Sequence, residues 1–220
     1  MSEQAPTSRL RRSGRRAKAE VNHRTRVGRE RSARTEQRIV NAALEVFAER
    51  GADGPVIDDF VRAAGVARGT FYNHFKSVEE LLHATSAWTT RELVETIEAS
   101  MKGIEDPSLR LGVGFRLFFV RAQRDPVWCR FVARVWKLGG LELPARDLEA
   151  GIRRGHFRVP SRAAAHDLLF GGLREALNRM ASERVPAAFG DQFVELCLQT
   201  LGASRTRIDA VLSYELPELD

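Results

Sequence analysis

A chain of 220 residues and 24.7 kDa is long enough to bury a proper hydrophobic core, in one large domain or two small ones. Its two cysteines, Cys129 and Cys197, are far apart and lack CxxC spacing, which argues against a disulfide framework and against a metal site. The formal net charge is +6, and there is neither an apolar run of about 18 residues nor an apolar N-terminal signal segment. These features predict a cytoplasmic protein that does not enter a membrane.

Residues 1–34 carry the positive charge. They hold ten Arg and Lys18 against three Glu, a net charge of +8, whereas the rest of the chain holds 24 basic and 26 acidic residues, a net charge of −2. Few apolar residues and no helical period predict a basic disordered arm. Such an arm could neutralise DNA phosphates and place Arg in a narrow minor groove. The alternative is a solubilising or cloning-derived tail.

Two helices are predicted within residues 35–64. Thr35 is placed to cap the first, which Gly51 ends, and Pro55 fits the first turn of the second, with Gly54 as a substitute cap. Both helices show one apolar face, formed by Ile39, Ala43, Val46 and Phe47 in the first and by Ile57, Phe60, Val61 and Ala64 in the second.

A third helix, which is short, is predicted at residues 67–75, after a turn at Gly65. Phe71 and Phe75 point to one side of it, and polar or small residues point to the other, namely Arg68, Gly69, Tyr72 and Asn73. Only the major groove shows each base pair a distinct pattern of donors and acceptors, and a helix of this kind can enter it. We therefore interpret residues 56–80 as a helix-turn-helix whose recognition helix is 67–75. The alternative, a helical hairpin in some other all-helical protein, leaves the polar face without a purpose.

The residues that carry this motif resemble the DNA-binding signature of the tetracycline-repressor (TetR) family of bacterial regulators. They are Gly65-Val66, the run Arg68 to Phe75 (RGTFYNHF), and Ser77 with Glu79-Glu80-Leu81-Leu82. The chain departs from the usual pattern at Val56, Ala67 and Val78, where a small hydroxyl residue, a Ser and a Lys are common. The resemblance implies an all-α fold of about nine helices. A three-helix helix-turn-helix domain is expected at 35–82 and a helical domain for ligand binding and dimerisation at 83–220.

Seven residues are expected to contact DNA. Arg68 is the candidate for a guanine, and Asn73 for an adenine or a phosphate. Tyr72, His74 and Lys76 are candidates for the DNA backbone. The N-terminus of the recognition helix, with Gly69 and Thr70, is expected beside a phosphate.

The next two helices are expected from the Ser77–Glu80 stretch to about Ser100 and from Pro107 to Arg124. Ser77 and Glu80 form a capping box before the first, and the second is apolar nearly all round, which indicates burial. Polar Arg116 lies in this apolar surface near Gly112, as it would in the wall of a small-molecule cavity. The alternative is that Arg116 pairs with a carboxylate of a neighbouring helix. The candidate pocket residues are Trp88, Gly112, Phe115, Arg116, Phe119, Gln123, Trp128, Phe131 and Trp136.

The last long helices are expected at 161–181 and 187–202, before a short terminal helix at 204–213. Each of the two long helices shows two apolar faces and so needs two neighbours. In the family that the chain resembles, these helices form a four-helix bundle with a second subunit, which implies a homodimer. The alternative is that they only complete the core of one subunit.

No paired carboxylates, HExxH, GxSxG or Gly-rich phosphate loop occurs, so neither an enzyme nor a cofactor is predicted. The favoured function is a ligand-responsive repressor that binds a pseudo-palindromic operator as a homodimer, with an unknown small-molecule effector. The alternative is a small-molecule binding protein with a vestigial helix-turn-helix. It is motivated by the five basic and eight acidic residues between positions 35 and 85, a net charge of −3.

Overall fold

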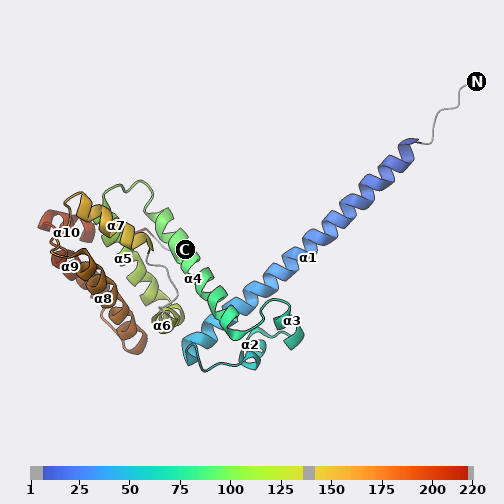
Figure 1. Ribbon diagram of the computed structural model, residues 1–220, viewed down its shortest axis with the longest axis horizontal. Helices are drawn as coiled ribbons and strands as arrows, with labels where there is room; N and C mark the ends of the chain where they lie inside the picture. The colour runs from blue at the N-terminus through green and yellow to red at the C-terminus, as the bar shows by residue number, and fades with distance from the viewer. Residues whose placement is uncertain (1–6, 136–141, 218–220) are drawn as a thin grey trace, which may run out of the picture.

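The computed structural model describes residues 7–135 and 142–217, and over these ranges the chain forms ten helices and no strand. The all-α class is therefore confirmed, with one helix more than the number expected. The helices are α1 (Thr7–Arg50), α2 (Ile57–Ala64), α3 (Arg68–Tyr72), α4 (Val78–Ser100), α5 (Pro107–Arg124), α6 (Pro126–Val135), α7 (Glu142–Arg153), α8 (Arg162–Ser182), α9 (Phe189–Thr200) and α10 (Arg205–Leu212). Helices α2 and α3 lie at one end of α4, and α5 and α7 to α10 gather on the other side of the molecule, while α6 lies next to the C-terminal end of α1 (Figure 1).

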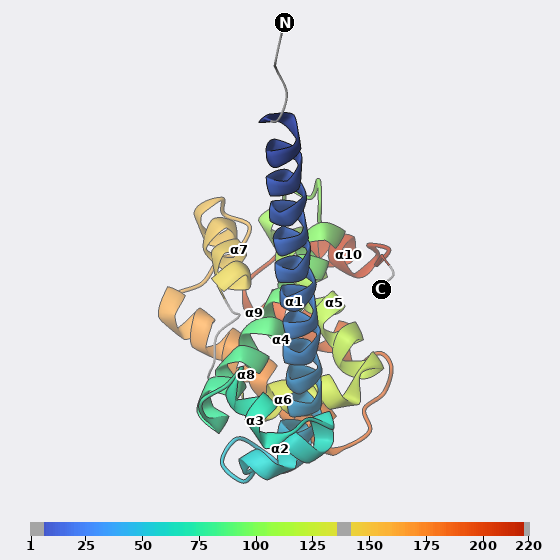
Figure 2. The same cartoon turned by 90° about the vertical axis from the view of Figure 1, so that its right-hand side faces the viewer.

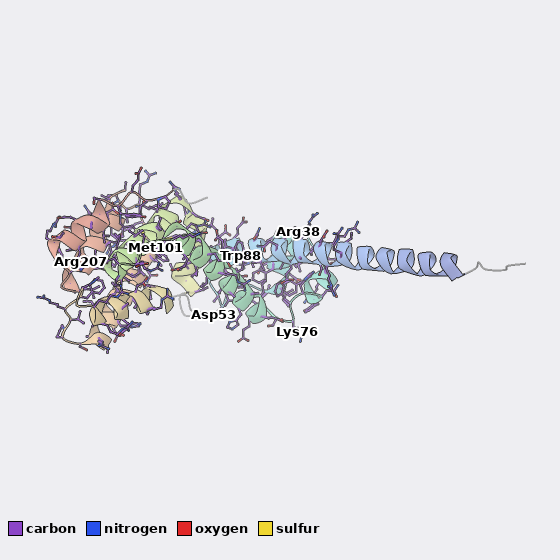
Figure 3. The ribbon with its side chains drawn as sticks, turned by 90° about the horizontal axis from the view of Figure 1, so that it is seen from above. Arg38, Asp53, Lys76, Trp88, Met101 and Arg207 are labelled. Carbon is purple, nitrogen blue, oxygen red and sulfur yellow. The ribbon has the colours of Figure 1, made fainter. Side chains whose placement is uncertain are left out.

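Helix α1 corrects the sequence-based prediction at the N-terminus. It begins at Thr7, where a disordered arm was expected, and it continues through Thr35, whose hydroxyl donates to the Arg31 carbonyl at 3.0 Å and caps nothing. Residues 7–34 hold ten Arg, a residue that favours helices, and no Pro. The packed turns that follow supply the nucleus from which the helix extends. The first half of α1 extends away from the C-terminal helices, on the side of α2 and α3 (Figures 1 and 3).

The core of the N-terminal domain is aromatic and includes part of α6. Phe47 of α1, Phe60 of α2 and Phe71 of α3 are fully buried, and the Phe47 and Phe60 ring centroids lie 4.9 Å apart. Phe131 of α6 joins this cluster, with its ring centroid 6.3 Å from that of Phe47. Arg134, also on α6, donates to the backbone carbonyl of Glu49 on α1. The C-terminal helices are thus joined to the N-terminal domain through α6 as well as through α4.

Helix α4 spans both parts of the molecule, as its length predicts. Its N-cap Ser77 accepts from the Glu80 amide at 3.1 Å, which is one half of the predicted capping box. The Glu80 carboxylate accepts from the amide of Lys76 at 2.7 Å, one residue before the cap, and not from that of Ser77. In its middle, Thr85 and Thr89 are buried and each donates its hydroxyl to the carbonyl four residues earlier at 2.8 Å. Such bonds compete with the helix's own hydrogen bonds and often bend helices.

Helix α5 lies at the centre of the second core. It begins at Pro107 behind the N-cap Asp106, whose carboxylate accepts from the Ser108 and Leu109 amides and from Arg207 of α10. Burial opposes ionisation of Asp106, but hydrogen bonds from the Ser108 hydroxyl, the Leu109 amide and Arg207 prevail and lower its pKa to about 2. Helices α6, α8, α9 and α10 also contribute buried apolar side chains to this core. Viewed from the end of the N-terminal domain, α7 and α10 lie on opposite sides of the molecule (Figure 2).

Candidate nucleic-acid interface

The turn between α2 and α3 has the geometry that its sequence predicts. Gly65 adopts the left-handed conformation with φ 60°. Its amide donates to the Arg62 carbonyl at 3.2 Å, and the Val66 amide donates to the Val61 carbonyl at 3.1 Å. This pattern of bonds ends a helix sharply, so α3 leaves the turn as a separate short helix.

Helix α3 buries one side and exposes the other. Its regular part, Arg68–Tyr72, is shorter than the predicted 67–75, because the backbone passes into a turn at Asn73 and His74. Phe71 is fully buried and Phe75 is 4% exposed, which anchors the helix to the core. The exposed residues are Arg68, Gly69, Tyr72 and Asn73, with Thr70 half-buried.

The Arg68 guanidinium has two neighbours on this exposed side. Its Nη1 lies 2.8 Å from Oδ1 of Asp58, and its Cζ lies 5.9 Å from the centroid of the Tyr72 ring. Hydrogen bonding with Tyr72 and the charge of Asp58 raise the pKa of Arg68, so it stays a cation. The side chains of Arg68 and Asp58 are both 58% exposed. A DNA base can therefore reach the planar donor group of Arg68, which matches guanine O6 and N7.

The backbone at the start of α3 is open to solvent. A Cβ atom built on Gly69 meets no heavy atom within 4 Å. The N-cap Ala67 makes no side-chain hydrogen bond to the first-turn amides. The phosphate contact of Gly69 and Thr70 remains a prediction, and the free backbone is compatible with it.

His74 is placed differently from the prediction. Its side chain is only 8% exposed, and its Nδ1 lies 3.8 Å from Oε2 of Glu36 on α1. The ring also packs against Phe75, with the centroids 6.3 Å apart. His74 therefore faces the domain rather than a phosphate in the free protein, because α1 passes behind the end of α3. Lys76, in contrast, is exposed (Figure 3).

The cap of α2 is also different from the one expected. The N-cap residue is Val56 and not Gly54. The Val56 amide donates to Oδ2 of Asp59 at 2.9 Å, and Asp59 also pairs with Arg50 of α1 at 2.6 Å. The Val56 hydrogen bond, followed by Arg50, lowers the pKa of Asp59. The carboxylate at the third position of α2 thus satisfies the N-cap amide, which is the half of a capping box that needs no hydroxyl at position 56.

The structure does not gather the predicted ligand-pocket residues around one cavity. Phe115 lines a cavity between α4, α5, α7 and α8. Trp88 packs against the N-terminal core where α4 joins the two domains (Figure 3), and Phe131 belongs to that same core. Phe119 and Trp128 are buried in the second core. Trp136 lies outside the described residues.

The three remaining pocket candidates have structural partners. Arg116 donates from Nε to Asp191 at 2.8 Å and from Nη1 to the carbonyls of Val211 and Tyr214 at 2.7 Å each. The alternative of a carboxylate partner is therefore confirmed for Arg116, since an almost buried guanidinium needs several acceptors. Gly112 provides close packing, because a Cβ there would lie 2.4 Å from Val211. Gln123 is exposed and donates to the Ala187 carbonyl at 3.2 Å.

An apolar surface remains open on α8 and α9. Leu168 and Leu196 are 60% and 62% exposed, which is unusual for leucine. A groove runs beside them and is lined by residues of both helices, among them Ala164, Gly172 and Phe193. We refer to the surface formed by Leu168, Leu196 and this groove as the α8–α9 face.

Comparison with known proteins identifies the N-terminal domain. Residues 39–85 match the bacterial regulatory proteins of the tetR family. The helix-turn-helix domain of the chain is therefore of the TetR family. Among curated relatives of the chain, the uncharacterised HTH-type transcriptional regulator YvdT of Bacillus subtilis is 37% identical over 70 residues, 32% of this chain and 36% of YvdT. The HTH-type transcriptional repressor DhaR of Mycobacterium sp. is 35% identical over 74 residues, 34% of this chain and 37% of DhaR. The matched segment thus spans little more than a third of each relative.

Solved structures extend the likeness beyond the N-terminal domain. FadR of Bacillus subtilis, a transcriptional regulator solved in complex with stearoyl-CoA, superimposes with a TM-score of 0.66 at 21% identity. The match covers 74% of this chain and 98% of FadR. At this identity the likeness concerns the fold of the chain and not its ligand.

Two further observations concern the described residues 7–135 and 142–217. None of their helices is long and apolar enough to cross a membrane, and they hold no group of three or more His, Cys, Asp or Glu side chains arranged to bind a metal. Burial raises the pKa of Cys129 to about 11 and that of Cys197 to about 12. Both thiols therefore stay protonated and are poor nucleophiles.

Proposed function

We propose that this TetR-family protein is a transcriptional regulator that binds operator DNA through α3 and acts as a ligand-responsive repressor. The observation that carries the proposal is the two-sided α3, anchored by buried Phe71 while Arg68, Tyr72 and Asn73 face solvent. Polar side chains on a rigid exposed helix are what direct readout of the major groove requires. The relative DhaR is itself a transcriptional repressor, which supports the direction of control.

A homodimer would carry two copies of α3 to one operator. The α8–α9 face supports this part of the proposal, because two large leucines exposed next to an apolar groove favour burial against a second subunit. Two recognition helices about 34 Å apart, or a multiple of this spacing, would read half-sites on the same side of B-DNA. The operator would then be pseudo-palindromic.

Helix α4 is the element through which a ligand would act. Leu81 near its start is fully buried in the N-terminal core, whereas Leu93 and Ile97 line the cavity of the C-terminal domain. The competing hydroxyl bonds of Thr85 and Thr89 lie between these two ends. A ligand that favours another tilt of α4 would change the spacing of the recognition helices and lower the affinity for DNA by linkage.

The direct test is DNA binding by the full-length protein. Fragments from upstream of its own coding sequence and of the flanking genes would be examined by gel retardation against an excess of unrelated competitor DNA. We expect one fragment to be retained at competitor concentrations that release the others. Equal release of every fragment would contradict the proposal of an operator-binding regulator.

A second candidate function is favoured by the charge of the N-terminal domain. Residues 35–85 carry a net charge of −3, and His74 faces Glu36 rather than solvent. A small-molecule binding protein that no longer uses its helix-turn-helix would show these features. The two functions differ in the gel-retardation test, because this candidate predicts no retained fragment.

Asp58 offers a test of sequence discrimination. Its carboxylate holds Arg68 in the free protein and lies on the face that would approach phosphates. We expect Asp58→Asn to strengthen binding to non-operator DNA by about threefold to tenfold, since a like-charge repulsion is removed, and to change operator binding less. The ratio of the two dissociation constants should therefore fall.

Asp53→Asn, which removes an exposed charge from the loop before α2, is the control and should shift both constants alike. An unchanged ratio for Asp58→Asn would show that Asp58 has no role in discrimination.

The basic half of α1 is proposed to bind the DNA backbone. Removing residues 1–30 should weaken binding to operator and non-operator DNA alike, because phosphate contacts carry no sequence information. The slope of log K against log salt should become shallower by about 1 for each phosphate that Arg no longer neutralises. The segment removed ends before Ile39, which is fully buried in the N-terminal core, so the melting temperature should stay the same. An unchanged salt slope would mean that the segment does not touch DNA.

A further inference from the structure

A cavity of about 70 Å³ lies between α4, α5, α7 and α8. Most of its wall is apolar, with Ile97, Phe115 and Leu173 contributing from three different helices. Met101 forms another part of the wall, next to Gly114, which adds no side chain. A methionine side chain adapts its shape more easily than a branched one, so this part of the wall can yield to a ligand.

One end of the cavity is polar and charged. Arg110 of α5 donates from Nη2 to Oε1 of Glu98 on α4 at 2.6 Å. Its Nε lies 3.2 Å from both carboxylate oxygens of Asp147 on α7. The side chains of Arg110 and Asp147 are 14% and 9% exposed, while Glu98 is 34% exposed. The polar end therefore runs from a partly exposed carboxylate to a buried one.

The charges at this end do not balance. Among the three paired groups, one guanidinium serves two carboxylates, so one negative charge has no cation of its own in direct contact. The exposed Arg146 on α7 acts on Asp147 through its charge, without a hydrogen bond or ion pair between them. Within the described part of the chain, the two oxygens of Asp147 share the single Nε–H of Arg110, although a carboxylate can accept about four hydrogen bonds. Burial raises the pKa of Asp147 despite the neighbouring Arg110. An additional donor, preferably cationic, would therefore satisfy acceptors that Arg110 leaves free.

We propose that this cavity is the effector site and that it binds a small apolar molecule carrying a protonated amine. The apolar part contacts Ile97, Phe115 and Leu173, and the ammonium group donates to Asp147 and Glu98. The proposal rests on the proposed function, in which a small molecule controls DNA binding, and names the chemical class of that molecule. A carboxylate ligand would instead meet two carboxylates. A long acyl chain such as that of stearoyl-CoA, bound by the relative FadR, exceeds the size of the cavity.

Ligand-observed saturation-transfer NMR on the full-length protein without DNA tests the charge preference. The probes are butylamine, butanol and butyrate, which share a short alkyl chain and differ in the polar end. We expect butylamine to bind about tenfold more tightly than butanol, as a charge-assisted hydrogen bond is stronger than a neutral one, and butyrate not to bind. Butyrate binding as tightly as butylamine, or no binding by any probe at millimolar concentration, would overturn the proposal.

Matched variants locate the binding. Asp147→Asn keeps the shape of the side chain but removes its charge, so butylamine should lose its advantage over butanol while butanol binding persists. Asp167→Asn makes the same change on the surface of α8, at a side chain that is 84% exposed, and should leave the preference intact. Should Asp147→Asn not fold, Glu98→Gln at the more exposed end serves the same purpose, and the expected loss of butylamine affinity is smaller. A full amine preference in the folded variant would refute the site. Since no DNA is present, failure of operator binding would be seen separately and would count against the regulator alone.

Discussion

Replacing Arg68 with alanine should abolish specific retardation of operator DNA and leave the fold unchanged. The guanidinium is exposed in the free protein, and its pair with Asp58 lies on the surface, where ion pairs contribute little to stability. In a complex the same group can donate twice to a guanine, and removing such a bidentate pair costs about tenfold to a hundredfold in discrimination at each half-site. In a homodimer the substitution removes the pair from both half-sites, which is why we expect one of the largest effects at this position.

The measurement is a pair of dissociation constants, one for operator and one for a scrambled duplex of equal length at the same salt concentration. Arg68→Ala should bring the two constants together. Arg153→Ala is the matched control, because it removes the same charge from an exposed position on α7, in the C-terminal part of the chain. Operator preference that survives in Arg68→Ala would exclude direct readout by this side chain. A melting temperature equal to that of the parent protein would show that the loss is not caused by unfolding.

Placing a charge on the α8–α9 face should separate the proposed dimer and weaken operator binding with it. Leu168→Glu and Leu196→Glu together replace side chains that are 60% and 62% exposed in the single subunit, so the subunit should keep its fold. In a dimer each buried leucine contributes about 1.5–3 kcal/mol, and a buried unpaired carboxylate is costly in addition. A monomer would hold only one half-site, and the loss of bivalent binding lowers affinity by about a hundredfold or more.

Sedimentation and gel retardation measure the two consequences independently. The double glutamate variant should sediment as a monomer at concentrations at which the parent is a dimer. Leu168→Met with Leu196→Met keeps the face apolar and should behave like the parent in both experiments. A glutamate variant that remains dimeric would place the interface elsewhere on the molecule, and a parent protein that is already monomeric would refute the homodimer itself.

Sequence reasoning located most helix boundaries because local signals determine them. Ser77 predicted the start of α4 and the Pro107 stretch predicted α5, and the structure shows Ser77 and Asp106 as the N-caps. The turn at Gly65 follows from a backbone conformation that glycine adopts without strain. Each of these features depends on residues within one or two helical turns, so the chain itself carries the information.

Interactions between distant segments were predicted less well. Asp191, the partner of Arg116, is 75 residues further along the chain, and the polar pattern of α5 was as consistent with a cavity as with an ion pair. Glu98 and Asp147 carried no sequence signal as a pair, because only the packing of α4 and α7 around Arg110 brings them together. His74 shows the same limit, since its place at the end of the predicted recognition helix made it a candidate for the DNA backbone, whereas the structure packs its side chain beside Glu36 of α1.

The sequence by itself determined the helical class, the turn before α3 and the side of α3 that carries Arg68, because hydrophobic period and helix caps act over a few residues. Tertiary structure decided which polar groups are buried together and which apolar faces remain uncovered. The cavity beside Asp147, the α8–α9 face and the entry of α6 into the N-terminal core all arise where helices distant in sequence meet. The reason is physical: an amphipathic pattern specifies that a helix buries one face, but the shape and charge of the partner surface exist only once the helices have packed.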